Sequence, residues 1–176
     1  PETFNIDPNS VEKNITEYTK AIMAVDIFGH SCDIKALNKI AKKYNLKLIT
    51  DTAQAPGIKN GDYFVGTESD IGGFSLNYHK HIHTGEGGIL VTNDDEYCER
   101  MQMIRNHAEA IVKNKKVKSL SNMVGYNFRM GEIEAAIGIE QLKKLRTFLD
   151  KRQLAANYLS EGLKKLKGLK IPVIKK

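Results

Sequence analysis

The fold of this chain is decided by the stretch Ala21-Ile22-Met23-Ala24-Val25-Asp26-Ile27-Phe28-Gly29, a continuous apolar run that ends at a glycine. Such a run is typical of a strand that is buried on both faces of a sheet. A second buried strand is expected at Leu46-Lys47-Leu48-Ile49-Thr50. Between them, Ser31 and Asp33 can cap a helix that Asn45 ends. The apolar stripe of that helix is Ile34, Leu37, Ala41 and Tyr44. Strand, helix and strand at this spacing predict a right-handed βαβ unit, and therefore an α/β fold.

Further elements follow the same logic along the chain. Residues 70–75 and 89–92 read as short strands that flank a polar segment with one lysine. Helices are expected at 11–15, where Asn9 and Ser10 would form the cap, after the acidic run 94–96, and in the long apolar pattern 133–166. The lysine-rich segment 113–118 is expected to be a solvated loop, and 169–174 reads as a strand that is just starting.

The composition excludes several classes of function. Lys and Arg number 27 against 21 Asp and Glu, and the net charge of +6 comes without any Trp, so a basic stripe interleaved with aromatics is not present and no nucleic-acid partner is expected. No apolar run reaches the ~18 residues of a membrane helix, and no signal peptide opens the chain. Cys32 and Cys98 show no metal or disulfide spacing, which predicts a reducing, cytoplasmic location.

Two residues at strand ends are candidates for chemistry. Ligands of parallel sheets lie outside the carboxyl ends of the strands, and Asp51 follows the second strand there. Lys80 follows the strand 70–75. A lysine attacks a carbonyl only when it is neutral, and the preceding apolar strand and neighbouring histidines could lower its pKa. From position alone, Asp51 as a helix or turn cap and Lys80 as a solvated side chain both stay open.

The segment around Lys80 carries three alternating histidines. His79, His81 and His83 would share one face of an extended segment and could then bind zinc or copper. A fourth ligand is not evident, so we expect no metal and favour a polar pocket in which these residues bind substrate or orient Lys80. The glycines of 85–88 precede a strand rather than a helix, so they do not form a dinucleotide-binding fingerprint.

Several motifs in a fixed order resemble one enzyme family. They are Asp51-Thr52-Ala53-Gln54-Ala55, Phe74-Ser75 with Lys80 five residues after the serine, Thr84-Gly85-Glu86-Gly87-Gly88, and Gly125-Tyr126-Asn127-Phe128-Arg129-Met130. The chain resembles the DegT/StrS-type sugar aminotransferases, which are pyridoxal-phosphate enzymes of the aspartate-aminotransferase fold (fold type I). The resemblance covers nearly the whole chain. It implies a three-layer α/β sandwich with a mostly parallel sheet, truncated at both ends because such enzymes are roughly twice this length.

The resemblance also implies a role for each matching residue. Lys80 would hold pyridoxal 5'-phosphate as a Schiff base and move protons as the catalytic residue. Asp51 would pair with the pyridine nitrogen of the cofactor, Gln54 would lie near its ring, and Ser75 would donate to its phosphate. Asn127 would reach the phosphate of the other subunit in a homodimer. Substrate contacts are expected for two further residues, His79 and Arg129.

The expected reaction moves an amino group from an amino acid, glutamate in this family, to a keto-sugar that is nucleotide-linked, in amino-sugar and cell-surface polysaccharide biosynthesis. Residues 1–146 would belong to the cofactor-binding large domain, and 147–176 would form the linking helix and the start of the small C-terminal domain. Three alternatives stay open. They are a sugar dehydratase, in which relatives replace the lysine by histidine, a non-catalytic pyridoxal-phosphate-binding fragment or regulator, and a metal-binding module built on the three histidines.

Overall fold

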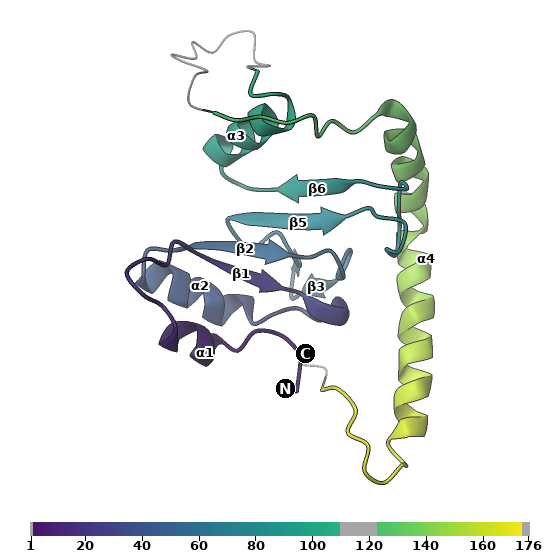
Figure 1. Ribbon diagram of the computed structural model, residues 1–176. Helices are drawn as coiled ribbons and strands as arrows, with labels where there is room; N and C mark the ends of the chain where they lie inside the picture. The colour runs from purple at the N-terminus through teal and green to yellow at the C-terminus, as the bar shows by residue number, and fades with distance from the viewer. Residues whose placement is uncertain (1, 110–122, 174–176) are drawn as a thin grey trace.

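A computed structural model describes residues 2–109 and 123–173 of the chain. Within these residues a four-stranded sheet forms the centre, in the order β1-β2-β5-β6 (Figure 1), with β1 (Ala21–Val25), β2 (Lys47–Asp51), β5 (Ile71–Ser75) and β6 (Gly88–Val91). β1, β2 and β5 run parallel, and β6 runs antiparallel to β5. The predicted α/β fold with a mostly parallel sheet is therefore confirmed.

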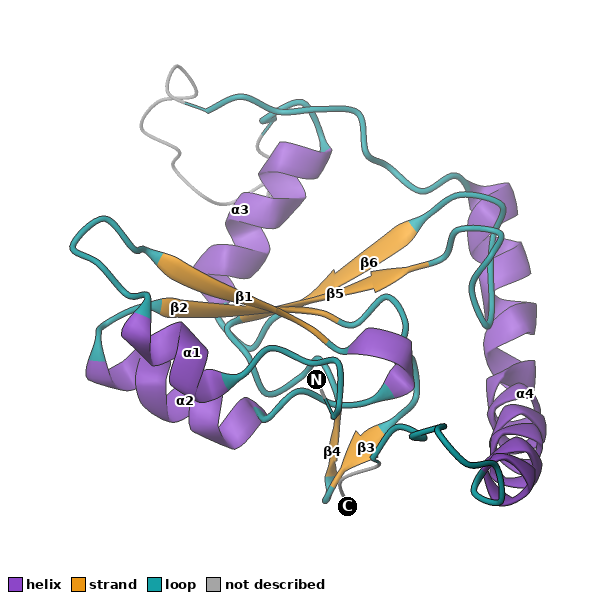
Figure 2. Ribbon diagram, turned by 60° about the horizontal axis from the view of Figure 1, so that its bottom comes forward, coloured by secondary structure: helices purple, strands orange, loops and turns teal. Residues whose placement is uncertain are grey.

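One face of the sheet is covered by α2 (Ile34–Lys43), with α1 (Pro8–Lys13) packed beside it (Figure 2). The helix begins as predicted, because Asp33 accepts a hydrogen bond from the amide of Ala36 at 3.1 Å. Asn45 takes a left-handed conformation with φ of 53° after the helix, also as predicted. The stripe that α2 buries consists of Ile34, Leu37, Ile40 and Ala41, and each such aliphatic side chain contributes roughly 1–3 kcal/mol to folding.

The two predicted strands differ from the structure in burial and in length. β1 ends at Val25 rather than at residue 28, because Phe28 adopts φ of 55° inside a 3₁₀ turn, η1 (Ile27–Gly29), and an extended strand cannot continue through that conformation. Burial on both faces is wrong for β1 and β2, since only alternate residues are buried and Met23 is 62% exposed. Among the described residues, α2 covers one face of β1 while the other face meets solvent.

The short helix near the start of the chain begins earlier than predicted. α1 has Asp7 as its cap, with Pro8 at its first position, so the predicted cap of Asn9 and Ser10 is wrong. Proline suits this position because it has no amide hydrogen to leave unpaired there. The carboxylate of Asp7 accepts from the amide of Asn9 and the hydroxyl of Ser10, each at 3.1 Å.

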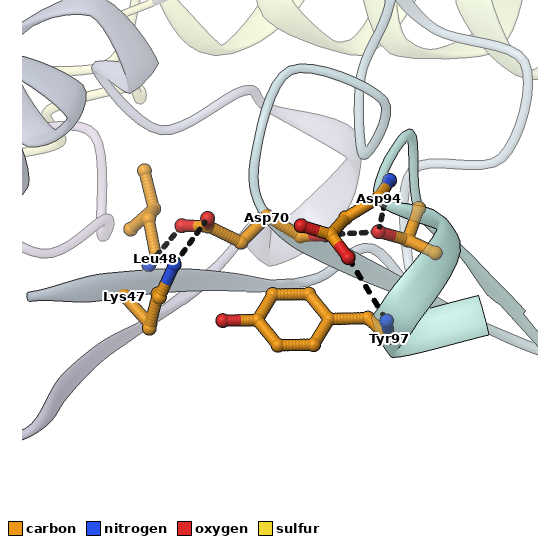
Figure 3. A network of polar contacts seen from close by, with 6 residues as sticks. Lys47, Leu48, Asp70, Asp94 and Tyr97 are labelled. Atoms are coloured by element: carbon orange, nitrogen blue, oxygen red, sulfur yellow. Dashed lines mark hydrogen bonds and ion pairs between the residues drawn. The ribbon is translucent and has the colours of Figure 1, made fainter. Parts of the chain in front are cut away.

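A polar network fastens α3 (Asp95–Arg105) to the amino edge of the sheet, on the side away from α1 and α2 (Figures 2 and 3). Asp70 accepts from the amide of Leu48 at 2.8 Å and lies 3.6 Å from the ammonium of Lys47. That ammonium also lies 5.1 Å from the ring centre of Tyr97, and the amide of Tyr97 donates to Asp94, the helix cap, at 3.0 Å. The predicted acidic start of this helix is confirmed, and the helices on both sides give the sheet its three-layer arrangement.

The longest helix, α4 (Glu132–Leu163), stands across the carboxyl edge of β1, β2 and β5 (Figure 1). It lies close to the turn at Gly57, where an added methyl group would meet side chains of Leu145 and Leu149 at 3.1 and 3.0 Å. The small hairpin β3 (Lys59–Asn60) and β4 (Tyr63–Phe64) follows that turn. The predicted domain boundary after residue 146 falls inside α4 and stays a prediction. Described residues 169–173 contain no strand, and the predicted loop 113–118 lies outside the described residues.

None of the helices in the described part of the chain is long and apolar enough to cross a membrane. The two ends of the described chain lie near each other (Figure 1), where the amide of Val173 donates to the carbonyl of Glu2 at 3.2 Å.

Gly72 tests the packing of β5 against the loop that precedes it. A methyl group at Gly72 would lie 1.9 Å from the carbonyl oxygen of Gly66, which is backbone and cannot move aside, whereas at Gly73 it would meet the side chain of Leu90 at 3.5 Å. We expect Gly72→Ala to lower the free energy of unfolding by at least about 2 kcal/mol. Gly73→Ala, the matched control one residue along, should change it by less than about 1 kcal/mol. Urea unfolding followed by circular dichroism measures both, and equal effects would contradict this account.

Candidate active site

Several of the predicted site residues follow the ends of the three parallel strands. In register, Val25 of β1 lies beside Asp51 of β2, which lies beside Gly73 of β5. Beyond the strands the pairing continues for one residue, since the amide of Asp26 donates to the carbonyl of Asp51 at 2.9 Å and that of Thr52 to Gly73 at 2.8 Å. These bonds bring the residues after β1, β2 and β5 to one edge, which faces α4 (Figure 1).

Asp51 lies on the sheet face opposite α2. Leu48 and Thr50 are buried beneath the sheet, so the alternation along β2 directs Asp51 to the other face. The half-buried carboxylate accepts from the amide of Ala53 at 3.1 Å and forms no other hydrogen bond or ion pair with a described residue. One carboxylate oxygen is thus free to pair with a protonated nitrogen of a ligand.

Ser75 lies on the same face as Asp51. It is the second residue after Gly73, the register partner of Asp51, so the period of two places both side chains on one side of the sheet. The hydroxyl oxygen of Ser75 accepts from the amide of Asn77 at 3.2 Å. Its hydrogen stays available to donate to an anionic ligand.

The Lys80 segment forms a loop that closes on itself between β5 and β6. The amide of Leu76 donates to the carbonyl of Gly87 at 2.8 Å, and the amide of Thr84 donates to the carbonyl of Leu76 at 3.0 Å. At the tip, the amide of Lys80 donates to the carbonyl of Asn77 at 2.9 Å. The half-buried Lys80 has an ammonium group that makes no hydrogen bond or ion pair within the described residues. A lysine held by its backbone and free at its tip can reach a carbonyl compound at this edge.

The histidines of this loop do not form a metal site in the described part of the chain, where no group of three or more His, Cys, Asp or Glu could hold a metal ion. His79 is exposed and its ring lies 3.8 Å from the ring centre of Tyr78. The Nδ1 atoms of His81 and His83 are buried without a hydrogen-bond partner among the described residues. Burial, followed by the positive charges of Arg152 and Lys80, lowers the pKa of His81, so its imidazole is held in the neutral form.

Gln54 has a structural contact that its sequence position did not indicate. Its side-chain oxygen accepts from the amide of Phe28 at 2.8 Å, which supports the left-handed backbone of that residue. Phe28 is 74% exposed and packs edge-on against Phe4, with ring centres 5.7 Å apart. The predicted place of Gln54 near a cofactor ring stays a prediction, and its observed role is to join the end of β1 to the turn after β2.

Asp26 is the buried residue of this edge that sequence reasoning missed. It is 0% exposed and accepts from the amide of Cys32 at 2.9 Å and from the hydroxyl of Thr52 at 2.8 Å. Burial and this carboxylate raise the pKa of the Cys32 thiol well above its usual range, which leaves the thiol unreactive. A signal was present in the sequence, since Asp26 is the one charged residue inside the apolar run 21–29.

Asn127 and Arg129 lie apart from the Asp51–Ser75–Lys80 edge in their contacts. Asn127 pairs with Asn106 in an isolated bridge after α3, and the guanidinium of Arg129 donates to the side chain of Asn106 at 2.8 Å. Next to them Tyr126 and Phe128 stack with ring centres 4.9 Å apart. Both Asn127 and Arg129 are exposed. Within one chain the structure therefore joins Asp51, Gln54, Ser75 and the Lys80 loop, and it leaves Asn127 and Arg129 on a separate segment.

An open hollow of about 980 Å³ lies at the opposite, amino edge of the sheet, between α2 and the start of α3. No predicted site residue lines it. Two of its acids are used in the network of Figure 3, in which Asp70 holds the backbone of Leu48 and Asp94 caps α3. Chemistry that needs Asp51 and Lys80 therefore belongs to the carboxyl edge and not to this hollow.

The chain has clear relatives among known proteins. The model of the DegT/DnrJ/EryC1/StrS aminotransferase family matches residues 1–176. A relative from Aneurinibacillus thermoaerophilus, dTDP-3-amino-3,6-dideoxy-alpha-D-galactopyranose transaminase, is 42% identical over 163 residues, which cover 92% of this chain and 43% of the relative. The chain spans 43% to 47% of the length of three curated relatives that it matches.

Two solved structures show the same fold. One is Helicobacter pylori PseC, an aminotransferase of pseudoaminic acid biosynthesis, at a TM-score of 0.82 and 37% identity over 93% of this chain and 43% of that one. The other is the E. coli GDP-4-keto-6-deoxy-D-mannose-3-dehydratase with bound hydrated PLP. Its TM-score is 0.83 and its sequence identity is 32%, and the match covers 98% of this chain and 48% of that one. Sequence identity above 30% across nearly the whole chain, together with these TM-scores, supports a shared fold and a common ancestor.

Asp26 is expected to stabilise the folded chain, although it is not one of the predicted site residues. Asp26→Ala leaves the amide of Cys32 and the hydroxyl of Thr52 buried without acceptors, so we expect the free energy of unfolding to fall by about 2–4 kcal/mol. Asp62→Ala, on an exposed turn, is the matched control and should change it by less than about 0.5 kcal/mol. Urea denaturation provides the measurement. If both variants unfold at the same urea concentration, Asp26 does not hold this edge.

Proposed function

Because this chain belongs to the DegT/DnrJ/EryC1/StrS aminotransferase family, we propose that it supplies the cofactor-binding part of an enzyme that moves an amino group from an amino acid to a sugar. We further propose glutamate as donor and a nucleotide-linked keto-sugar as acceptor, for use in amino-sugar and polysaccharide biosynthesis. The observation that carries the proposal is the meeting of Asp51, Ser75 and Lys80 at one sheet edge, each with a polar group left free.

The residues at this edge fit pyridoxal phosphate. Asp51 has a free carboxylate oxygen for a protonated ring nitrogen, and Ser75 has a hydroxyl hydrogen for a phosphate. Lys80 has an ammonium without a counter-ion, so it can bind the cofactor carbonyl covalently once it loses its proton. When bound, pyridoxal phosphate accepts the electron pair that is released when the Cα–H bond of the donor breaks. Related solved structures support this choice, since one contains hydrated PLP and another, DesV, a ketimine intermediate.

The chain's own residues divide the work. Asp51 would keep a positive charge on the ring nitrogen of the bound cofactor. The amine of Lys80 would take the proton from the donor Cα and give it to the cofactor carbon that carried the aldehyde. The loop 76–87 can position that amine because its backbone is closed by hydrogen bonds at Leu76 and Thr84. Gln54, through Phe28, keeps the edge beside β1 in place.

A second copy of the chain is proposed to complete the site. Asn127 is exposed and pairs with Asn106 in the turn after α3, which supports the proposal that it reaches a partner's cofactor phosphate in a homodimer. Arg129 and the exposed His79 are proposed to contact substrate. The exposed apolar side chains of α4, among them Ile133, Ile139 and Leu142, are suited to such an interface.

The domain division and the location are proposals of the same kind. Residues 1–146 would form part of the cofactor-binding large domain, and 147–176 the link and the start of the small C-terminal domain. The cytoplasm is proposed because both Cys32 and Cys98 are free thiols, as a reducing compartment would keep them.

A sugar dehydratase is the second candidate. The favouring observation is the likeness to dehydratases, including the E. coli enzyme at 32% identity. Lys80 argues for amino transfer instead, because relatives that perform dehydration carry a histidine in place of this lysine. Keto-sugar that gains nitrogen supports amino transfer, and keto-sugar that loses water supports dehydration. A chain that binds the cofactor without reacting with any amino acid would be a regulator.

Lys80 is expected to be the residue that binds the cofactor covalently. We would add pyridoxal phosphate, reduce with borohydride, digest and locate the label by mass spectrometry. Label should be confined to the peptide that contains Lys80 and should vanish in Lys80→Ala, whereas Lys59→Ala, an exposed lysine of β3, should keep it. Scattered or absent label on this chain and on the intact gene product would contradict the proposal.

Asp51 is expected to control cofactor affinity and proton transfer. Asp51→Asn keeps the oxygen that accepts from the amide of Ala53 but loses the negative charge. We therefore expect cofactor binding at least about tenfold weaker, which is about 1.4 kcal/mol, and no half-reaction with glutamate in single-turnover absorbance. Asp62→Asn is the control for the loss of one carboxylate. Unchanged affinity and half-reaction in Asp51→Asn would remove Asp51 from the site.

A further inference from the structure

Asn77 is the residue at which the hydrogen bonds of the Lys80 loop converge. Its amide donates to the hydroxyl oxygen of Ser75 at 3.2 Å, and its carbonyl accepts from the amide of Lys80 at 2.9 Å. Its side-chain oxygen accepts from the amide of His79 at 3.1 Å. A residue outside the predicted site therefore contacts three residues that were predicted to belong to it.

The remaining polar group of Asn77 joins the two limbs of the loop. Its side-chain nitrogen donates to the carboxylate of Glu86 at 2.7 Å, so a residue before Lys80 is tied to one that follows it. Glu86 is held in turn, because its carbonyl accepts at 2.9 Å from the hydroxyl of Thr84, which is 5% exposed. The bond to Glu86 is charge-assisted, and hydrogen bonds of that kind are shorter and stronger than neutral ones.

The bonds to Asn77 shape the turn from which Lys80 extends. A side-chain oxygen that accepts from the amide two residues later forms an Asx turn, and a carbonyl that accepts from the amide three residues later closes a β-turn. Asn77 makes both bonds, the first with His79 and the second with Lys80. The position of the Lys80 backbone therefore depends on one residue and on its anchor at Glu86.

An amide side chain meets both demands of this position. It accepts from a backbone N–H and donates to a carboxylate at the same time, whereas a carboxylate can only accept. The bond between Asn77 and Glu86 is exposed, and changes at such places alter the stability of a whole fold only slightly. We therefore look for its effect in the geometry of the loop.

From these contacts we propose that Asn77 is a positioning residue for Lys80. Its side chain, anchored on Glu86, fixes the turn so that the amine of Lys80 meets the cofactor carbonyl at the distance and angle that their reaction needs. The inference rests on the proposed function, because it concerns a lysine that binds a cofactor. Asn77 acts through Lys80 and needs no contact with the cofactor itself.

The test exchanges the donor and the acceptor of the Asn77–Glu86 hydrogen bond in the intact gene product. Asn77→Asp keeps an acceptor for the amide of His79 but sets a second negative charge against Glu86, so the bond is lost. Adding Glu86→Gln to Asn77→Asp supplies a side-chain nitrogen that can donate, and the bond returns in the opposite direction. Asn77→Ala removes both side-chain bonds without adding charge and should resemble Asn77→Asp. Asn14→Asp, which removes an exposed donor at the end of α1, is the matched control.

Two measurements separate positioning from folding. Without cofactor, hydrogen exchange followed by mass spectrometry reports on the peptide that carries Lys80, and Asn77→Asp should speed its exchange about threefold to tenfold, as expected for a lost hydrogen bond. With pyridoxal phosphate and borohydride, the rate of labelling at Lys80 should fall about tenfold or more, because a small displacement of a reacting group lowers its rate steeply. The double variant should recover most of both values, and Asn14→Asp should change neither. The urea concentration at the midpoint of unfolding should stay nearly constant across the set.

The outcomes distinguish this inference from the proposed function. Unchanged exchange in Asn77→Asp, or no recovery in the double variant, overturns the inference. Faster exchange with an unchanged labelling rate also overturns it, as does a large fall in the urea midpoint, which would assign Asn77 to folding. If Lys80 of the unchanged protein takes no label, the proposed function is rejected, whereas labelling that is indifferent to Asn77 rejects the inference alone.

Discussion

Parallel pairing of β1, β2 and β5 fixes the position of the candidate site, because parallel strands end at the same edge of a sheet. The pairing is set by α2, whose buried stripe includes Leu37 and Ile40 and covers the face that holds Ile22 and Leu48. A shift of one residue in β2 would turn Leu48 to solvent and Asp51 beneath the sheet. The hydrophobic core and the orientation of the functional carboxylate therefore depend on one register.

The edge of the sheet is held by bonds that continue beyond the strands. Asp26 holds the residues after β1 against Thr52, and Gln54 holds the left-handed Phe28. Gly72 lets the preceding loop reach the backbone of β5. These contacts lie beneath or beside Asp51 and Ser75, so the groups that would bind a cofactor are held in place by their neighbours in the fold. Such supporting contacts are what give a site its geometry.

The other face of the sheet and much of α4 carry apolar side chains without a partner in the described residues, as Met23 at 62% and Ile133 at 75% exposed show. The chain spans 43% of its relative from Aneurinibacillus thermoaerophilus. Exposed apolar surface of this extent marks contact faces. It fits the proposal that the site is completed by groups outside this stretch.

The sequence by itself determined most of the elements, and it predicted the site residues. The apolar runs, the Asp33 cap and the left-handed Asn45 are local signals, and strand-end positions placed Asp51 and Lys80 at one edge. Motif order led to the family. Two predicted bounds were wrong. α1 begins at Pro8, because proline suits the first position of a helix. β1 ends before the left-handed Phe28, whose amide donates to Gln54. The tertiary structure alone decided the one-sided burial of β1 and the buried role of Asp26. Each of these depends on residues distant in the sequence, and periodicity reports only which side of its own element a residue faces.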